Sequence, residues 1–367
     1  MGAVMKSKLI LTSKLQSILC IIFGVLGVGG LIFYFVFSSL GKLIDLGSLS
    51  FINRYHTGII IILIVLCFLF SILLVIKNRK YETRYLKAKR YVFSFLSVLI
   101  CSIIILFLFI YSIQDYLIDR NNLIFQPNTI SKETSDRFVF VYDNVEKISF
   151  TTEHNYKIQG WLVKNSSIEK SPLIIYFGGS GQEVSDMINY AEQLKGYSVA
   201  LVNYRGFGTS EGSPSQDAVF NDSKLIYDTL SKRKDIDNKK IVTMGWSLGT
   251  AVSVFLSENR QVKGTILVAP IDNVYSRIHA SVPFLPFSLI MKQKFDSISR
   301  APSISTPLLC LIGDSDINVS PDSSLKLVER WKGTHIVKTY KDEDHFLLYH
   351  SNDSWTDINN FLKNILK

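Results

Sequence analysis

Three long apolar runs in the first 114 residues constrain the fold of this chain more than any other feature. They lie at about residues 15–37, 58–76 and 92–113, and none of them contains a charged side chain. About 20 apolar residues cross the hydrocarbon core of a bilayer as a helix, so the runs predict three transmembrane helices. The alternatives are buried helices of a soluble fold or, for the first run, a signal peptide. Three such runs so close together, and no small-residue cleavage site, favour retained helices.

The basic residues around these runs predict their orientation. Residues 1–114 contain twelve Lys and Arg against two acids, whereas the remaining residues contain 28 basic and 29 acidic side chains. A nucleic-acid-binding domain would carry the positive charge itself, which argues against nucleic acid as a partner. The N-terminal tail and residues 77–90 are basic, so both are expected in the cytoplasm, although residues 77–90 are also suited to bind anionic lipid. Three spans then place residues from about 115 onward outside the cytoplasm, in a periplasmic, luminal or extracellular space.

The pattern of the chain changes from about residue 138. Short runs rich in β-branched and apolar residues alternate with stretches of helical period, which predicts a mostly parallel sheet covered by helices on both faces. Eight strands are expected, near residues 147–152, 156–164, 172–179, 198–205, 240–246, 262–270, 307–314 and 335–340. The sequence therefore predicts a linker over residues 115–137 and an α/β domain over 138–367.

The pentapeptide G-W-S-L-G, from Gly245 to Gly249, lies between a predicted strand and a predicted helix. Strand, tight turn and helix form the setting of a nucleophile elbow, where the two glycines allow other backbone to approach closely. The helix N-terminus beneath Ser247 favours negative charge that develops there. A lone G-x-S-x-G is common by chance, and its position between strand and helix makes Ser247 the candidate nucleophile.

A nucleophilic serine requires a base and an orienting acid, which follow it in the order acid then histidine. His345 comes directly after the last predicted strand and is the candidate base, while a plain loop histidine is the alternative. Asp314 and Asp316 both follow the strand L-L-C-L-I-G. The residues alone leave these two open, together with a local role for an acid beside the histidine, Asp342 or Asp344.

An oxyanion hole requires backbone N–H groups close to the nucleophile. Leu248, the residue after the serine, supplies one of them. The second is expected from the glycine-rich loop over residues 178–181, where the N–H of Ser180 is the predicted donor. A phosphate-binding loop is the rival interpretation, but the Lys-Ser/Thr of a P-loop is missing.

From residue 157 to the C-terminus the sequence resembles the α/β-hydrolase superfamily, in particular its Bem46-like and ABHD13-like serine hydrolases. The resemblance rests on YFGGSGQEVSD, NYRGFGTSEGSPS, GWSLGTAVS, ILVAPIDNVYS, PLLCLIGDSDINVSP and DEDHF. It implies Asp316 as the acid, three residues after Gly313 and shortly before the Val319-Ser320-Pro321 turn. Gly178 stands where many relatives have a histidine. The resemblance does not extend to residues 1–114, and it implies neither a metal nor an organic cofactor.

These observations predict an α/β-hydrolase fold, with a mostly parallel eight-stranded sheet and flanking helices, preceded by three transmembrane helices. The expected function is hydrolysis of an ester, thioester or amide by Ser247, Asp316 and His345, with Ser180 and Leu248 at the oxyanion. The expected partners are a small acyl or lipid-like substrate and membrane lipids, and residues 272–302 are long enough for a small cap. The alternative is an inactive hydrolase fold used for interaction at the membrane, and a transporter ranks last because the spans carry no polar pathway.

Overall fold

The computed structural model describes residues 103, 124–165, 167–194, 196–274, 291 and 293–367. The chain divides into two compact units, and the second comprises residues 111–278 and 287–367. Within the described residues, no helix is both long enough and apolar enough to cross a membrane. Apart from residue 103, the three predicted spans lie outside the described residues, as does most of the predicted cap over 272–302.

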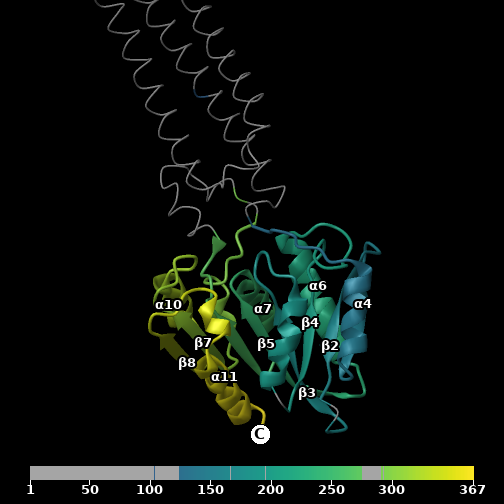
Figure 1. Cartoon of the computed structure of the whole chain (residues 1–367). Helices are drawn as coiled ribbons and strands as arrows, with labels where there is room; N and C mark the ends of the chain where they lie inside the picture. The colour runs from purple at the N-terminus through teal and green to yellow at the C-terminus, as the bar shows by residue number, and fades with distance from the viewer. Residues whose placement is uncertain (1–102, 104–123, 166, 195, 275–290, 292) are drawn as a thin grey trace, which may run out of the picture. The chain divides into compact units, whose positions relative to one another are not determined.

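An eight-stranded sheet forms the centre of the second unit (Figure 1). Its spatial order is β1-β2-β4-β3-β5-β6-β7-β8. β2 pairs antiparallel with both β1 and β4, and every other pairing is parallel. All eight predicted strands are present, and their bounds are β1 (Val145–Thr151), β2 (Lys157–Val163), β3 (Ser171–Phe177), β4 (Ser198–Val202), β5 (Ile236–Trp246), β6 (Gly264–Val268), β7 (Leu308–Gly313) and β8 (His335–Tyr340).

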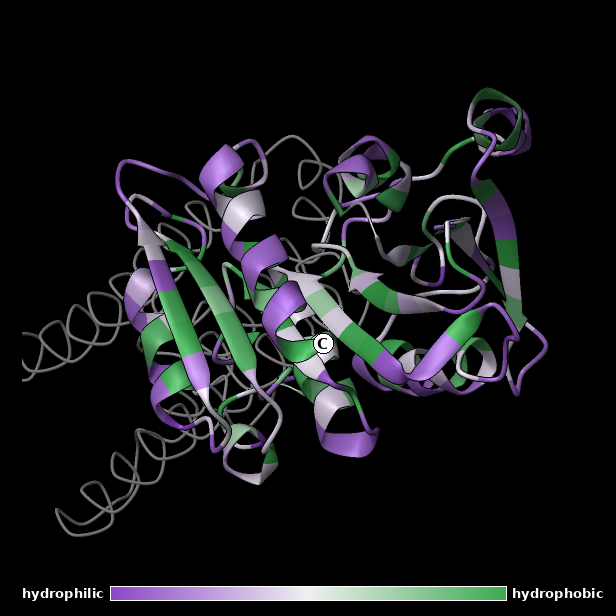
Figure 2. Ribbon diagram, turned by 90° about the horizontal axis from the view of Figure 1, so that it is seen from below, coloured by the Kyte–Doolittle hydropathy of each residue, from purple (hydrophilic) through white to green (hydrophobic). Residues whose placement is uncertain are grey.

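Helices cover both faces of this sheet. Successive residues of a strand point to opposite faces, so a strand that is apolar throughout has side chains to bury on each face. On β7, Leu309 and Leu311 join one buried cluster, whereas Cys310 and Ile312 join a second cluster. The first cluster includes side chains of α5 and α11, and the second includes side chains of α7 and α10. Figure 2 shows this as green, hydrophobic stretches on the strands and mixed colours on the helices around them. The helix bounds are α4 (Lys132–Val141), α5 (Met187–Ala191), α6 (Gln216–Leu230), α7 (Leu248–Asn259), α10 (Pro321–Glu329) and α11 (Asn352–Ile365).

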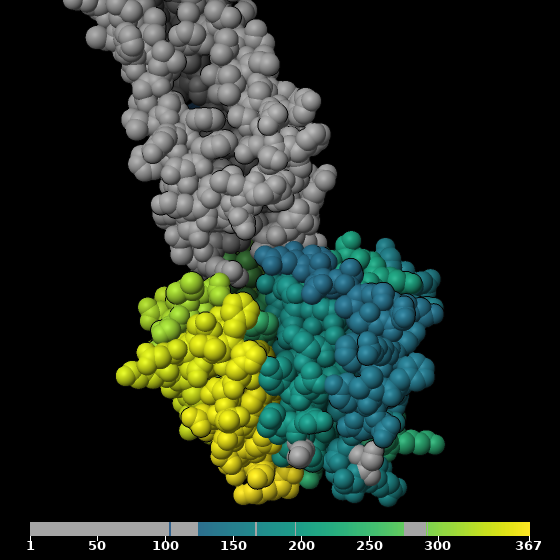
Figure 3. Space-filling view, in the orientation of Figure 1, coloured from purple at the N-terminus to yellow at the C-terminus, as the bar shows by residue number. Residues whose placement is uncertain are grey.

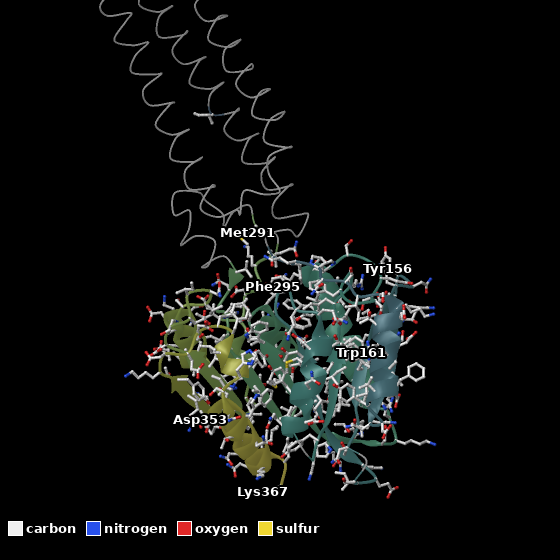
Figure 4. All side chains as sticks on the ribbon, in the orientation of Figure 1. Tyr156, Trp161, Met291, Phe295, Asp353 and Lys367 are labelled. Carbon is white, nitrogen blue, oxygen red and sulfur yellow. The ribbon has the colours of Figure 1, made fainter. Side chains whose placement is uncertain are left out.

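The predicted linker over residues 115–137 is wrong in its described part, because residues 124–137 are built into the domain. Ile124 and Phe125 are buried, and α4 begins at residue 132 with the Ser131 hydroxyl accepting a hydrogen bond from the backbone of Thr134. The indole of Trp161, labelled in Figure 4, donates to the carbonyl of Ser135 in that helix over 3.3 Å. In Figure 3 the blue atoms of this segment lie against the teal body of the domain. The folded domain therefore begins at or before residue 124.

Candidate active site

The predicted site residues all follow the carboxyl ends of parallel strands. The loop over residues 178–181 follows β3, Ser247 follows β5, Asp316 follows β7 and His345 follows β8. These strands are parallel to one another, so their carboxyl ends meet at one edge of the sheet. This edge is where open α/β sheets collect their functional groups.

Ser247 occupies the tight turn between β5 and α7. Its φ of 52° and ψ of −118° are backbone angles that L-residues rarely adopt, and the residue is only 5% exposed. A Cβ on Gly249 would overlap the carbonyl oxygen of Phe177, and a Cβ on Gly245 would overlap the backbone of Gly249. Only glycine therefore fits on either side of the serine, as the sequence predicted. The N–H of Ser247 also donates to the carbonyl of Val268 on β6 over 3.0 Å, which holds the turn in place.

Asp316 and His345 form a buried hydrogen-bonded pair. The distance from Oδ2 of Asp316 to Nδ1 of His345 is 2.7 Å, and each residue is 5% exposed. The other carboxylate oxygen, Oδ1, accepts from the backbone N–H groups of Asn318 and Val319, both at 2.8 Å. An Nδ1–H that donates to the carboxylate leaves Nε2 as the basic nitrogen of the ring.

Two of the other carboxylates that the sequence left open, Asp314 and Asp344, have hydrogen-bond partners elsewhere. Asp314 is exposed, and its Oδ1 accepts from the hydroxyl of Ser315 and from the N–H of Asp342. Asp344 accepts from the backbone N–H groups of Leu347 and Phe346, two bonds that lower the pKa of its carboxyl. Of these acids, Asp316 is the one that contacts the imidazole.

The indole of Trp246 connects the serine turn with the histidine, a contact that the sequence did not predict. Its ring centroid is 5.2 Å from that of His345, and its Nε1 donates to the His345 carbonyl over 3.3 Å. Since Trp246 directly precedes Ser247, this contact joins the turn after β5 to the loop after β8. The second position of G-x-S-x-G was the available clue, because an aromatic residue there is placed to pack against the histidine loop.

The glycine-rich loop after β3 lies beside the candidate nucleophile. A Cβ built on Gly179 would be 2.9 Å from the Trp246 ring and 3.6 Å from the Cβ of Ser247. Among the described residues, the backbone N–H groups of Ser180 and Leu248 have no hydrogen-bond acceptor. The sequence predicted these two N–H groups as oxyanion donors, and their role stays a prediction.

The hydroxyl of Ser247 and the Nε2 of His345 also make no hydrogen bond to a described residue. Catalytic hydrogen bonds are often long in unliganded enzymes and shorten when substrate binds. The arrangement thus offers a hydroxyl, an imidazole held by a buried carboxylate, and two unused N–H donors near one edge of the sheet.

Solved structures share this fold. The esterase Pf2001 of Pyrococcus furiosus superposes with a TM-score of 0.53 at 22% identity, and the match covers 66% of this chain and all of the esterase. A mostly parallel eight-stranded sheet with a serine on a strand–turn–helix elbow defines the class, a protein of α/β-hydrolase fold.

The chain belongs to the prolyl oligopeptidase family, whose model matches residues 184–367, half of its length. A protein of Mycobacterium tuberculosis is 30% identical over 179 residues, which are 48% of this chain and 64% of that protein. Protein bem46 of Schizosaccharomyces pombe is 26% identical over 195 residues, 50% of this chain and 64% of bem46. The chain thus covers just under two thirds of the length of these two relatives.

Proposed function

We propose that this protein is a membrane-anchored serine hydrolase that cleaves an acyl bond through Ser247, His345 and Asp316. The observation that carries the proposal is the buried hydrogen bond between His345 and Asp316. This pair follows strands that end at the same edge of the sheet as β5, which leads into the strained turn of Ser247. Burial matters because an imidazole held by a buried carboxylate keeps one tautomer and one orientation.

The proposed reaction follows from these positions. The hydroxyl oxygen of Ser247 attacks the carbonyl carbon of the substrate, and its proton passes to Nε2 of His345. Asp316 stabilises the resulting imidazolium, and the N–H groups of Ser180 and Leu248 hold the oxyanion. The tetrahedral adduct then breaks its bond to the leaving group, which takes the proton from His345. Water deprotonated by His345 attacks the acyl-enzyme, releases the acid and restores the serine.

The proposed substrate is a small or lipid-like acyl compound, and the proposed anchor is residues 1–114. The three uncharged apolar runs of this region support the anchor, and the basic residues near them support a hydrolase domain outside the cytoplasm. A reporter fused after Lys367 tests the topology. Activity of a periplasmic or extracellular reporter is expected, and activity of a cytoplasmic reporter would contradict the orientation.

Labelling with a fluorophosphonate tests the nucleophile, because this probe reacts covalently with activated serines. We expect wild-type protein in the membrane fraction to be labelled and Ser247→Ala to lose the label, while the matched variant Ser231→Ala at the end of α6 keeps it. Labelling that persists in Ser247→Ala would contradict the assignment. Wild-type protein that reacts neither with this probe nor with a broad ester panel would instead favour an inactive hydrolase fold.

Hydrolysis of p-nitrophenyl esters of increasing acyl length tests the substrate class, with a peptide anilide as the competing amide substrate. A preference for an ester of one chain-length range is the expected result. Faster cleavage of the anilide than of every ester would replace the acyl-ester proposal with a peptidase.

A further inference from the structure

The loop that contains Ser180 is rich in glycine, although an oxyanion donor such as the Ser180 N–H must have a fixed direction. Gly178, Gly179 and Gly181 surround Ser180, and glycine has the largest backbone freedom of any residue. Electrostatic stabilisation of an oxyanion requires donors that are already aimed before the reaction begins. Something outside the loop must therefore hold its peptide groups.

Three successive carbonyl groups of the loop each accept one hydrogen bond, two from other segments of the chain and one from the residue that directly follows the loop. The Gly178 carbonyl accepts from the Tyr204 hydroxyl at 2.8 Å, and the Gly179 carbonyl accepts from the N–H of Gln182 at 3.3 Å. The Ser180 carbonyl accepts from the N–H of Gln126 at 2.7 Å.

These bonds fix the direction of the Ser180 N–H. The peptide group between Gly179 and Ser180 is planar, with its C=O and N–H pointing in opposite directions. Holding the Gly179 carbonyl therefore aims the Ser180 N–H away from Gln182, while the bonds to the peptide groups on either side prevent the loop from rotating. Burial raises the pKa of Tyr204 well above its ordinary value, so its hydroxyl keeps the proton that it donates.

Gln126 and Tyr204 are connected through a cluster of packed aromatic rings. Gln126 lies in residues 124–130, which we name the lead-in segment, ahead of α4. Its neighbour Phe125 is fully buried and packs edge-to-face on Tyr204, Phe207 and Phe295 with ring centroids 6.0, 6.4 and 5.8 Å apart. Phe295 is labelled in Figure 4.

The far end of the lead-in segment is also fixed. The N–H of Gly208 donates to the carbonyl of Asn128 at 2.8 Å, and the N–H of Ile130 donates to the carbonyl of Gly208 at 3.2 Å. The segment is thus attached to the loop after β4, which contains Tyr204, and to the loop after β3.

We propose that the lead-in segment and Tyr204 are positioning elements of the oxyanion hole, which hold the 178–181 loop so that the Ser180 N–H faces the reacting carbonyl. This inference rests on the proposed function. The lead-in segment lies outside residues 184–367, the region matched by the family model, so a part of the chain beyond that region would help to set the rate of the acyl-transfer step. Loss of one of these bonds weakens binding of the transition state more than binding of the substrate.

Tyr204→Phe in the full-length protein tests the proposal, because it removes one hydroxyl and keeps the aromatic packing. Tyr227→Phe is the matched control, since the Tyr227 hydroxyl also donates to a backbone carbonyl, that of Gln261, at 2.7 Å. With p-nitrophenyl acetate we expect Tyr204→Phe to lower kcat about tenfold with KM nearly unchanged, a smaller loss than removal of an oxyanion donor causes. Tyr227→Phe should retain wild-type kcat.

A second pair of variants tests the lead-in segment at a single position. Gln126→Pro removes the N–H that bonds to Ser180, and Gln126→Ala keeps it. We expect kcat to fall about tenfold for the proline variant and to stay within about twofold of wild type for the alanine variant. Thermal midpoints and the labelled fraction at saturating fluorophosphonate identify any variant that is partly unfolded, and kcat is expressed per labelled site.

Inhibition by a trifluoromethyl ketone separates positioning from a general structural effect. The ketone adds the serine hydroxyl to give a tetrahedral oxyanion, so its Ki should rise in Tyr204→Phe and Gln126→Pro by the factor by which kcat/KM falls. Equal kinetics for Tyr204→Phe and Tyr227→Phe, or unchanged ketone affinity, would overturn the inference while leaving the proposed function intact. Wild-type protein inert to both probe and ester would overturn both.

Discussion

At the scale of single residues, Asp316 uses its two carboxylate oxygens for different purposes. Oδ1 accepts two backbone N–H groups of its own loop, and Oδ2 contacts the imidazole of His345. The first contacts fix the carboxylate, and the second allows it to select the tautomer of the ring. Asp314 lies two residues away and contacts only its own loop and the N–H of Asp342.

Asp316→Asn should therefore separate catalysis from folding. The amide can keep its oxygen toward the two backbone N–H groups, but its NH₂ then faces Nδ1 and forces the proton of the ring onto Nε2. We expect kcat for p-nitrophenyl acetate to fall about 10³- to 10⁴-fold, as expected for loss of the orienting acid. Asp314→Asn is the control and should stay within about twofold of wild type. A large loss in the control with a small loss in Asp316→Asn would reverse the assignment.

The sequence predicted the positions of the candidate serine and histidine in the fold better than it predicted the contacts around them. Ser247 and its glycines are specified locally, because the turn needs glycine at fixed spacing and β5 and α7 flank it. The choice between Asp314 and Asp316 depends on how the loop after β7 folds back to His345, which spacing alone does not determine. The tilted ring contact of Trp246 with His345 joins residues 99 positions apart, so the aromatic residue within G-x-S-x-G hints at a partner but does not identify it.

At the scale of elements, strands and amphipathic helices were predictable, and α4 was not. The central strands β3, β4, β6 and β7 are apolar runs buried in the sheet, whereas β8 has no buried residue, and α7 follows the G-x-S-x-G turn as the sequence predicted. In α4 only Ser135 is buried, while Phe140 is 86% exposed, so the helix carries no apolar face that periodicity could detect. It is held instead by Trp161, which packs edge-to-face on Phe138 at 5.4 Å.

The contact between α7 and β3 explains why one helical position requires glycine. Alanine in place of glycine usually stabilises a helix by about 1 kcal/mol. At Gly249 the added Cβ would overlap the backbone carbonyl of Phe177, which cannot move without displacing β3. We expect Gly249→Ala to lower the free energy of unfolding by roughly 2–3 kcal/mol and to abolish labelling of Ser247.

The matched control is Gly264→Ala at the start of β6. Its Cβ would meet the Cδ1 of Ile365, the tip of a flexible side chain near the end of α11. Urea denaturation followed by tryptophan fluorescence should show a much smaller loss for this variant. Equal losses for both would show that backbone overlap at Gly249 is not the cause.

At the scale of the whole molecule, the boundary of the folded domain decides which part of the chain can be separated from the N-terminal region. Composition placed the boundary at residue 138, where the alternation of strands and helices begins. The fold places it at or before residue 124, because Ile124 and Phe125 are buried and α4 covers Trp161. A composition change therefore marks where regular alternation begins, whereas burial marks where the domain begins.

Two trimmed chains test this boundary, one beginning at residue 115 and the other at residue 138. The shorter chain lacks the ring of Phe125, whose loss alone costs about 3–5 kcal/mol when such a side chain is fully buried. It also lacks most of α4, which exposes Trp161, and it lacks the N–H of Gln126, which frees the three glycines of the 178–181 loop. Since a domain of this kind has about 5–15 kcal/mol of stability, we expect only the longer chain to unfold cooperatively on heating, measured by circular dichroism. A chain beginning at residue 138 that melts at the same temperature as the longer one would show that residues 124–137 contribute nothing to the fold, and it would restore the boundary that composition indicated.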